Sequence, residues 1–416
     1  MEGLLMNYPK VAIIGSGPSG CYAAEFMRKK WSFAEISIFE SLPVPYGQIR
    51  YGIAADHQEE KAVMRQFDRL FERENVNFIG NVTIGKDVTY QELQQNFDVV
   101  IQSTGFFQDK KLSIPIAADG CVIGAVNLLR LINGCPISKI PIFSNSHGSI
   151  GTKIAIIGAG NVTLDLIRLL SKKNEDLLGS DVNDEVLNVI KKQTIRTIHI
   201  VNRGDVDKIK FDLTLLKELS DLSYVSIRLS GTNLENSEIL KMIDSNKNKS
   251  NISTEIIFHF NCIPSKILKF DDMTILHTVD AKKNGGSNFP VDTVITAIGI
   301  EKCNFDYEVK GYYCPPDISF IQHQPLGSLT ENRQKTLNFI NQLIDDFENT
   351  NKKTMKLGFN AIKEKMTNKV VDYTSWKCIE AYERISAPPD RCRKKITSIP
   401  YMLKIVEMMN YRFCEK

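Results

Sequence analysis

The sequence lacks the features that mark several common protein classes. No stretch reaches the roughly 18 uninterrupted apolar residues of a membrane-spanning helix. The formal net charge is only +3 over 416 residues, which is too small to indicate a nucleic acid or a membrane surface as a partner. We therefore expect no nucleic-acid partner and at most a peripheral contact with a membrane.

Cysteine is present, but not in an arrangement typical of a metal or redox site. The chain has 9 cysteines, an odd number, and no Cys-x-x-Cys pair. This pattern disfavours a disulfide framework, a zinc site and a dithiol redox couple, so we expect no metal ligands. Reduced thiols favour an intracellular compartment. The first ten residues resemble neither a secretory signal nor a transit peptide, which leaves the cytoplasm open as the location.

Strand-like and helix-like segments alternate along the chain. This alternation predicts an α/β protein with parallel sheets, and the length suggests two or three domains. Two polar segments, 171–192 and 244–253, are typical of solvated surface loops. The predicted strands are Val11–Ile14, Ile36–Phe39, Val99–Ile101, Ile154–Ile157, Thr197–Val201, Glu255–Phe258 and Thr293–Ala297.

A first glycine motif, "VAIIGSGPSG", follows a strand and precedes a helix. Gly15, Gly17 and Gly20 give the spacing G-x-G-x-x-G, in which the glycines allow a tight turn, the approach of a pyrophosphate and close packing of helix on strand. Glu40 ends the next strand, where a carboxylate accepts hydrogen bonds from ribose hydroxyls. The motif predicts a dinucleotide without a 2′-phosphate, such as FAD.

A second motif, "GTKIAIIGAGNVTLD", repeats the pattern with one change. Gly158 and Gly160 are followed by Thr163 instead of a third glycine, so we expect slightly looser packing of helix on strand. The next strand ends without an acid, and Arg203 stands there instead. A guanidinium binds a 2′-phosphate bidentately, so this motif predicts NADP(H). A solvated turn is the alternative for Arg203.

Two nucleotide sites of opposite 2′ preference are typical of a flavoprotein in which FAD and a nicotinamide meet for hydride transfer. The absence of a Cys-x-x-Cys pair argues against thioredoxin-reductase chemistry. A flavin–NADPH electron donor like the glutamate-synthase small subunit normally brings cysteine clusters, which this chain lacks.

The segment "SLPVPYGQIRYGIAADHQEEK" resembles the adrenodoxin reductase family, the mitochondrial-type ferredoxin–NADP reductases. The resemblance extends over about residues 9–406 and includes "GNVTIGKDV", "TAIGI" and "DYTSWKCIEAYE". The matching positions are Pro45, Tyr46, Gly47, Arg50, Gly52, Ala54, Asp56 and His57.

The resemblance implies two Rossmann-like domains. A discontinuous FAD domain, residues 1–105 and 299–416, would surround an NADP domain at 106–298. It also implies that NADPH reduces FAD, which passes single electrons to a [2Fe–2S] ferredoxin of the adrenodoxin type. The family further implies a monomer in a mitochondrion or a mitochondrion-related organelle.

Site residues also follow from the resemblance, by matched position. Asp165 and His57 would be the catalytic positions, near the path between flavin, nicotinamide and partner; a helix-surface acid and a structural histidine are the alternatives. Arg203 would hold the 2′-phosphate, next to Asn202 where the family usually has another arginine. FAD contacts would come from Gly15, Gly17, Ser19, Gly20, Glu40, Gln48 and Ile84, and NADP contacts from Ala159, Gly160, Asn161, Val162 and Glu218.

One segment, 315–327, departs from the family pattern. Asp317 stands where the family has a tryptophan that packs at the flavin, while Gly327, Ser328 and Leu329 keep backbone amides for both cofactors. The departure raises a non-enzymatic alternative, in which a degenerate member binds nucleotide and acts as a scaffold.

An acidic ferredoxin would need a basic docking face. We expect this face on the lysines of the NADP domain, with the segment 391–395 as a second candidate. The candidate lysines are Lys241, Lys247 and Lys249, followed by Lys208 and Lys210.

Overall fold

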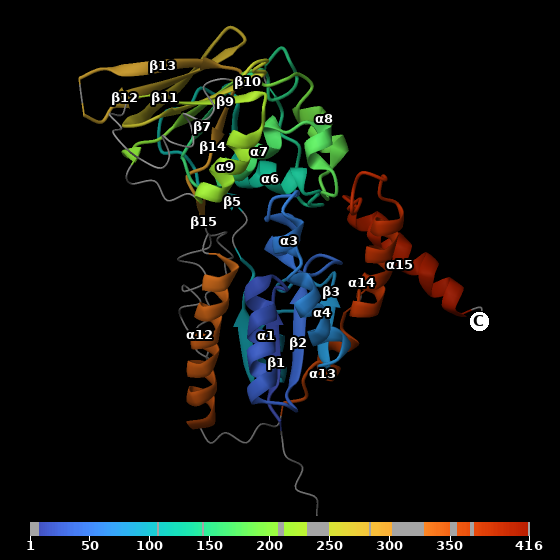
Figure 1. Ribbon diagram of the computed structural model, residues 1–416. Coiled ribbons are helices and arrows are strands. Elements are labelled where there is room, and N and C mark those ends of the chain that lie inside the picture. The colour runs from blue at the N-terminus through green and yellow to red at the C-terminus, as the bar shows by residue number, and fades with distance from the viewer. Residues whose placement is uncertain are drawn as a thin grey trace, which may run out of the picture.

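The computed structural model describes residues 8–105, 108–143, 145–206, 212–230, 249–282, 284–301, 328–349, 356–366 and 370–414. Two α/β units lie end to end (Figure 1). The first unit is built on a four-stranded sheet and the second on a six-stranded sheet. Within the described ranges, no helix combines the length and apolar character needed to cross a membrane.

The first unit has a parallel sheet in the order β3-β2-β1-β4. Its strands are β1 (Lys10–Ile14), β2 (Glu35–Glu40), β3 (Val76–Gly80) and β4 (Val99–Gln102). Helix α1 (Pro18–Lys30) follows the first glycine motif and packs against α12 (Leu329–Asn349), from the far end of the chain (Figure 1). The other helices used below are α2 (Gly47–Tyr51), α3 (Gln58–Lys61), α14 (Tyr373–Ile385) and α15 (Ile399–Cys414).

The second unit has a parallel sheet in the order β6-β14-β7-β8-β10-β9. Its strands are β6 (Val122–Gly124), β7 (Lys153–Ile157), β8 (Thr197–Val201), β9 (Val225–Ser230), β10 (Thr254–His259) and β14 (Thr293–Thr296). An antiparallel sheet packs beside them and consists of β11 (Cys262–Phe270), β12 (Met273–Asp280) and β13 (Gly286–Val291).

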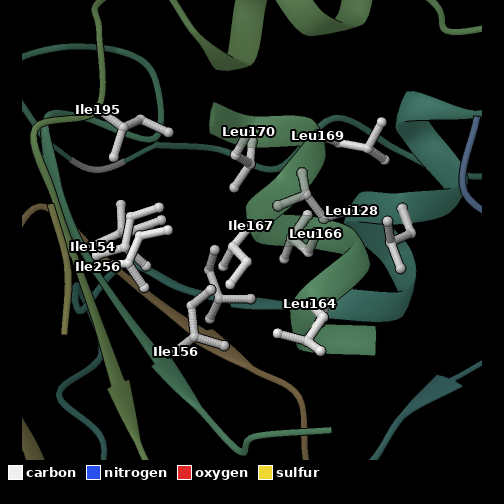
Figure 2. Close-up of a cluster of buried hydrophobic side chains, with 14 of the residues drawn as sticks. Leu128, Ile154, Ile156, Leu164, Leu166, Ile167, Leu169, Leu170, Ile195 and Ile256 are labelled. Carbon is white, nitrogen blue, oxygen red and sulfur yellow. The ribbon is translucent and has the colours of Figure 1, made fainter. Parts of the chain in front are cut away.

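The core of the second unit lies between its parallel sheet and the helices that follow β6 and β7. These are α6 (Ala125–Ile132) and α7 (Asn161–Ser171). Figure 2 shows leucines of α7 lying between isoleucines of the sheet and Leu128 of α6. Helix α7 buries so much of its surface because apolar residues occupy most positions of "NVTLDLIRLLS".

All the strands predicted from apolar runs are present, and all of them pair in parallel. The α/β fold class is therefore confirmed. Strands β3, β6 and β9 of the parallel sheets were not predicted, nor was the antiparallel sheet.

The chain passes between the two units twice, and the two passages lie together. Strands β5 (Gln108–Asp109) and β15 (Ile300–Glu301) pair in antiparallel fashion. The Lys110 amide also donates to the Gly299 carbonyl at 3.0 Å. This arrangement supports the proposed boundaries near Gly105 and Gly299, which stay a prediction.

The prediction of a solvated loop at 171–192 was wrong. The segment forms a 3₁₀ turn (Asn174–Leu177) and helix α8 (Asp184–Ile190). Leu177 and Ile190 are fully buried because most apolar residues of this polar segment pack into the core of the second unit, although Leu178 is exposed. Most of the segment 244–253 lies outside the described residues.

Candidate functional site

The first glycine motif forms a tight turn between β1 and α1. Gly15 has a φ of 103°, which favours glycine, and a Cβ there would lie 2.4 Å from the Ser103 carbonyl oxygen. A Cβ at Gly20 would lie 2.0 Å from the Gly15 carbonyl oxygen. At Gly17, by contrast, a Cβ would meet no atom within 4 Å. Gly15 and Gly20 therefore close the turn, while the space above Gly17 is open.

A cavity of about 360 Å³ begins at this open space. Such a volume lies within the range of cofactor sites, ~300–1,000 Å³. Gly17 caps α1 without a side-chain hydrogen bond, so the first backbone amides of the helix are available to an anion. Of the residues expected at FAD, the cavity lining includes Gly15, Gly17, Ser19, Glu40, Gln48 and Ile84. These residues fit a dinucleotide.

Glu40 is held in place at the end of β2. Its Oε2 accepts hydrogen bonds from the Ser16 amide at 3.1 Å and the Ser16 hydroxyl at 2.7 Å. Its Oε1 accepts from the Leu42 amide at 3.1 Å. These contacts hold the Glu40 carboxylate at the wall of the cavity.

Sequence reasoning missed residues that reach the cavity from distant segments. Asn332, in the first turn of α12, lines it and exchanges hydrogen bonds with Ser19 at 3.0–3.2 Å. Arg130 of α6 also lines it. Nothing in the local sequence marked either Asn332 or Arg130 as a residue of this cavity.

The residues expected after the altered segment are only partly described. Asp317 and Gly327 lie outside the described residues. Ser328 precedes α12, and its hydroxyl accepts from the Glu331 amide at 3.2 Å. Leu329 begins the helix and packs at the core of the first unit. Neither Ser328 nor Leu329 belongs to the described lining of the cavity.

The second glycine motif forms the corresponding turn between β7 and α7. Gly158 has a φ of 111°, and a Cβ there would lie 2.3 Å from the Ala297 carbonyl oxygen. A Cβ at Gly160 would meet nothing within 4 Å. Thr163, in the third position, is fully buried and donates from its hydroxyl to the Gly158 carbonyl at 2.8 Å. The threonine thus joins helix and turn by a hydrogen bond, whereas Gly20 in the first motif only packs closely against its turn.

The other residues expected at NADP surround this turn. Ala159 precedes Gly160, and Asn161 and Val162 begin α7, which has no side-chain cap at its N-terminus. The Asn161 side-chain oxygen accepts from the Asp212 amide at 2.8 Å, next to helix α9 (Leu213–Asp221). Arg203 is exposed and follows β8. Its position fits either a 2′-phosphate ligand or the solvated alternative.

His57, Asp165 and Glu218 meet where the two units face each other. His57 precedes α3, Asp165 lies on α7 and Glu218 on α9. His57 Nδ1 is 3.8 Å from Asp165 Oδ1, and His57 Nε2 is 3.5 Å from Glu218 Oε2. Arg168 is fully buried among them, 3.0 Å from Asp165, and also contacts Asp56.

Burial and charge set the protonation of this group. Burial opposes a charge on His57, but its hydrogen bond with Glu60 and the neighbouring carboxylates raise its pKa above the ordinary value. Burial raises the pKa of Asp165, despite Arg168 beside it. The pKa shifts of both groups are therefore in the direction of tighter proton binding.

The second candidate for a docking face, the basic segment 391–395, is mostly buried. Arg391, Arg393 and Lys395 are buried and bonded to acids within the chain, because this segment packs between the two units. Lys249 donates to three backbone carbonyls, those of Ser220, Leu222 and Val225. The other candidate lysines, 208, 210, 241 and 247, lie outside the described residues.

Comparisons with known proteins agree with this geometry. Residues 9–214 match the family model described as pyridine nucleotide-disulphide oxidoreductase. Cindoxin reductase of Citrobacter braakii is 32% identical over 95% of this chain and 90% of its own length. A probable mitochondrial NADPH:adrenodoxin oxidoreductase of Schizosaccharomyces pombe is 26% identical over 90% of each chain.

A solved structure shares the whole fold. FprA of Mycobacterium tuberculosis in complex with NADPH superposes with a TM-score of 0.79 at 23% identity, covering 96% of this chain and 100% of that one. The chain has two glycine turns with a cavity above the first, and it is 32% identical to Cindoxin reductase over nearly its full length. It therefore belongs to the adrenodoxin reductase family of FAD- and NADP(H)-binding oxidoreductases.

Proposed function

We propose that this chain passes electrons from NADPH, through FAD, to a [2Fe–2S] ferredoxin of the adrenodoxin type. The observation that carries the proposal is the pair of open glycine turns, one in each unit, with an acid after the first and an arginine after the second. Relatives named as adrenodoxin and cindoxin reductases support the class of partner.

In the first unit, the chain's own residues would bind and orient FAD. The Gly17 turn and the uncapped start of α1 would hold the pyrophosphate, while Glu40 would accept the adenosine ribose hydroxyls. Gln48 and Ile84 would line the rest of the cavity. Bound FAD supplies the step from paired to single electrons.

In the second unit, the Gly160 turn would receive the pyrophosphate of NADP(H) at the start of α7. His57, Asp165 and Glu218 would hold charge and protons where the two units face each other. This role favours the catalytic expectation for His57 over the structural one, because a histidine with only a structural role would not need acids from both units.

The experiment is a reconstitution followed by two additions. Purified protein incubated with FAD should turn yellow, with absorption near about 450 nm. NADPH should bleach it without oxygen, and an oxidised [2Fe–2S] ferredoxin should restore the colour. A protein that stays colourless would contradict the proposal and favour the scaffold alternative raised by the segment 315–327.

Arg203 gives the test of nicotinamide choice. Replacing Arg203 with Gln should raise the KM for NADPH at least about tenfold, since a charged hydrogen bond contributes ~1.5–3 kcal/mol, and leave the KM for NADH unchanged. The measurement is steady-state reduction of ferricyanide by each nucleotide. Equal rates of the unaltered protein with NADH and NADPH would assign Arg203 to the solvated alternative.

The partner and the compartment remain proposals of the same kind. An acidic ferredoxin fits a basic face, for which the lysines at 208, 210, 241 and 247 stay candidates. A mitochondrion or related organelle is the proposed location, and named relatives include both mitochondrial and bacterial proteins. Fluorescence microscopy of the tagged full chain distinguishes this location from the cytoplasm.

A further inference from the structure

Tyr46 has a backbone conformation that bulky residues rarely adopt. Its φ is 81°, in the left-handed region. Within the described part of the chain, the other non-glycine residues with a positive φ are four asparagines and one aspartate, the residue types that tolerate this region best. Tyrosine has no short polar side chain to make the region accessible, so the surrounding structure must impose this conformation.

The side chain of Tyr46 is held in the core of the first unit. It is 1% exposed, and its ring packs edge to face on Trp376 of α14, with 6.3 Å between the ring centroids. Its hydroxyl donates to Asp68 Oδ1 on helix α4 (Met64–Glu72), which also accepts from the Tyr373 hydroxyl at 2.6 Å. Burial, and then the charge of Asp68, raises the pKa of Tyr46, so the hydroxyl stays protonated and remains a donor.

The backbone of the same segment forms part of the cavity wall. The Tyr46 amide donates to the Ser16 carbonyl at 3.1 Å, inside the first glycine turn. The next residue, Gly47, has a φ of 40°, and a Cβ there would lie 3.1 Å from the Gly17 Cα. Gly17, Gly47 and Gln48 all line the cavity. The left-handed conformation of Tyr46 therefore places this stretch of wall beside the turn that is expected to bind FAD.

We propose that Tyr46 is a positioning residue for FAD, whose buried ring keeps residues 46–48 in the conformation that the bound cofactor requires. This inference rests on the proposed function. An alanine backbone without the ring disfavours the left-handed region by roughly tenfold, so most FAD-free molecules would hold the segment in another conformation. FAD affinity falls by the same factor, because the apparent dissociation constant is the intrinsic one divided by the fraction of molecules in the competent conformation.

The test compares alanine with glycine at position 46, by titrating FAD with FAD-free protein and following the fluorescence of FAD. Both substitutions remove the ring, but glycine enters the left-handed region about as readily as the right-handed one. Tyr46→Ala should raise the dissociation constant of FAD about tenfold. Tyr46→Gly should raise it only about twofold.

Thermal unfolding without FAD separates positioning from packing. A tyrosine that only packs the core would lower the melting temperature in both variants and leave their FAD dissociation constants equal. Asn75→Ala and Asn75→Gly are the matched control pair, because Asn75 also has a positive φ, 51°, but is exposed and lies outside the described cavity lining. The two control variants should differ in melting temperature and have the same FAD affinity.

Tyr46→Phe decides the question if neither variant at position 46 folds. It keeps the ring and removes only the hydroxyl bond to Asp68. It should raise the dissociation constant of FAD at least about twofold, the effect of one hydrogen bond.

The outcomes are distinguishable. Equal FAD dissociation constants in the alanine and glycine variants would overturn this inference alone, as would an unchanged constant in Tyr46→Phe where that variant decides. A difference of the same size between the two variants at position 75 would also overturn it, as a general effect of left-handed residues. Unaltered protein that never binds FAD would overturn the proposed function and this inference together.

Discussion

At the scale of single residues, two glycines of the same motif should respond in opposite ways to one methyl group. Gly20→Ala places a Cβ 2.0 Å from the Gly15 carbonyl oxygen, so it should lower the melting temperature of FAD-free protein by several degrees, about 1–3 kcal/mol. Gly17→Ala meets no protein atom within 4 Å, so FAD-free stability should not change.

The same Gly17→Ala variant should lose FAD affinity, at least about tenfold, since the new methyl group occupies the space above the start of α1. Thermal unfolding with and without FAD measures both effects. Gly160→Ala is the parallel change in the second unit and should raise the KM for NADPH only. Unchanged FAD affinity in Gly17→Ala would show that the pyrophosphate does not bind at this turn.

Residues of this kind were predictable because their role is local. A glycine triplet between strand and helix, and Glu40 at the tip of the next strand, follow from spacing and backbone geometry alone. Asn332 and Arg130 were not predictable, because they reach the cavity from positions 313 and 115 residues after Ser19 and Gly15, the difference of their sequence numbers. Such proximity is created by the fold.

At the scale of elements, adjacent strands of the second unit carry a histidine pair. His199 Nδ1 on β8 lies 3.0 Å from His259 Nε2 on β10, and Phe289 of β13 packs on both rings. Burial, then the neighbouring His199 and Arg228, lowers the pKa of His259 to about 4. Burial and Lys153 lower the pKa of His199.

This pair should make the second unit sensitive to acid. The folded protein favours neutral histidine, so the contribution to stability is complete above the unfolded pKa of about 6.5 and is lost as the pH falls toward about 4. The loss should be on the order of 2 kcal/mol for a partly exposed ring. Urea unfolding at pH 7.5 and pH 5 measures it.

His259→Gln should flatten this pH dependence. His147→Gln is the control, because His147 lies apart from the pair, 3.5 Å from Asp292. If the glutamine variant at 259 keeps the full loss of stability between the two pH values, the acid sensitivity arises elsewhere.

The sequence predicted most of the parallel strands of both units but misread the polar segments. Apolar runs identify buried strands directly, because a parallel sheet is covered on both faces. Charge alone does not show whether a polar segment is exposed to solvent or buried. Segments 171–192 and 391–395 both looked solvated or available for docking, yet each supplies the partners that bury the other: Arg391 bonds to Asp184, and Lys395 to Asp181.

At the scale of the whole molecule, a buried cluster of charges joins the two units. Asp181 accepts from Lys61 of α3 and from Lys395, both at 2.7 Å. All three side chains are at most 3% exposed, and the Asn133 side-chain oxygen accepts from Lys61 at 2.6 Å. The cluster ties the first unit, the second unit and the C-terminal segment together.

Asp181→Asn should destabilise the protein strongly, because two buried ammonium groups would lose their shared carboxylate. The expected loss is about 3–5 kcal/mol in the free energy of unfolding, measured by urea unfolding. Glu185→Gln is the matched control: it removes the exposed pair with Lys394, which should cost at most about 1 kcal/mol. Equal losses in both variants would show that the buried cluster contributes no more to the free energy of unfolding than an exposed ion pair does.

The pairing of β5 with β15 has a consequence for how this protein can be rearranged. Because the chain leaves and re-enters the first unit through two hydrogen-bonded strands, both ends of the intervening segment lie about one strand spacing apart, ~5 Å. Such a segment can be removed or reconnected as a single unit. Joining residue 108 directly to residue 301 should leave the first unit able to fold without the intervening segment. New chain termini placed within that segment should leave its two ends, at residues 108 and 301, paired.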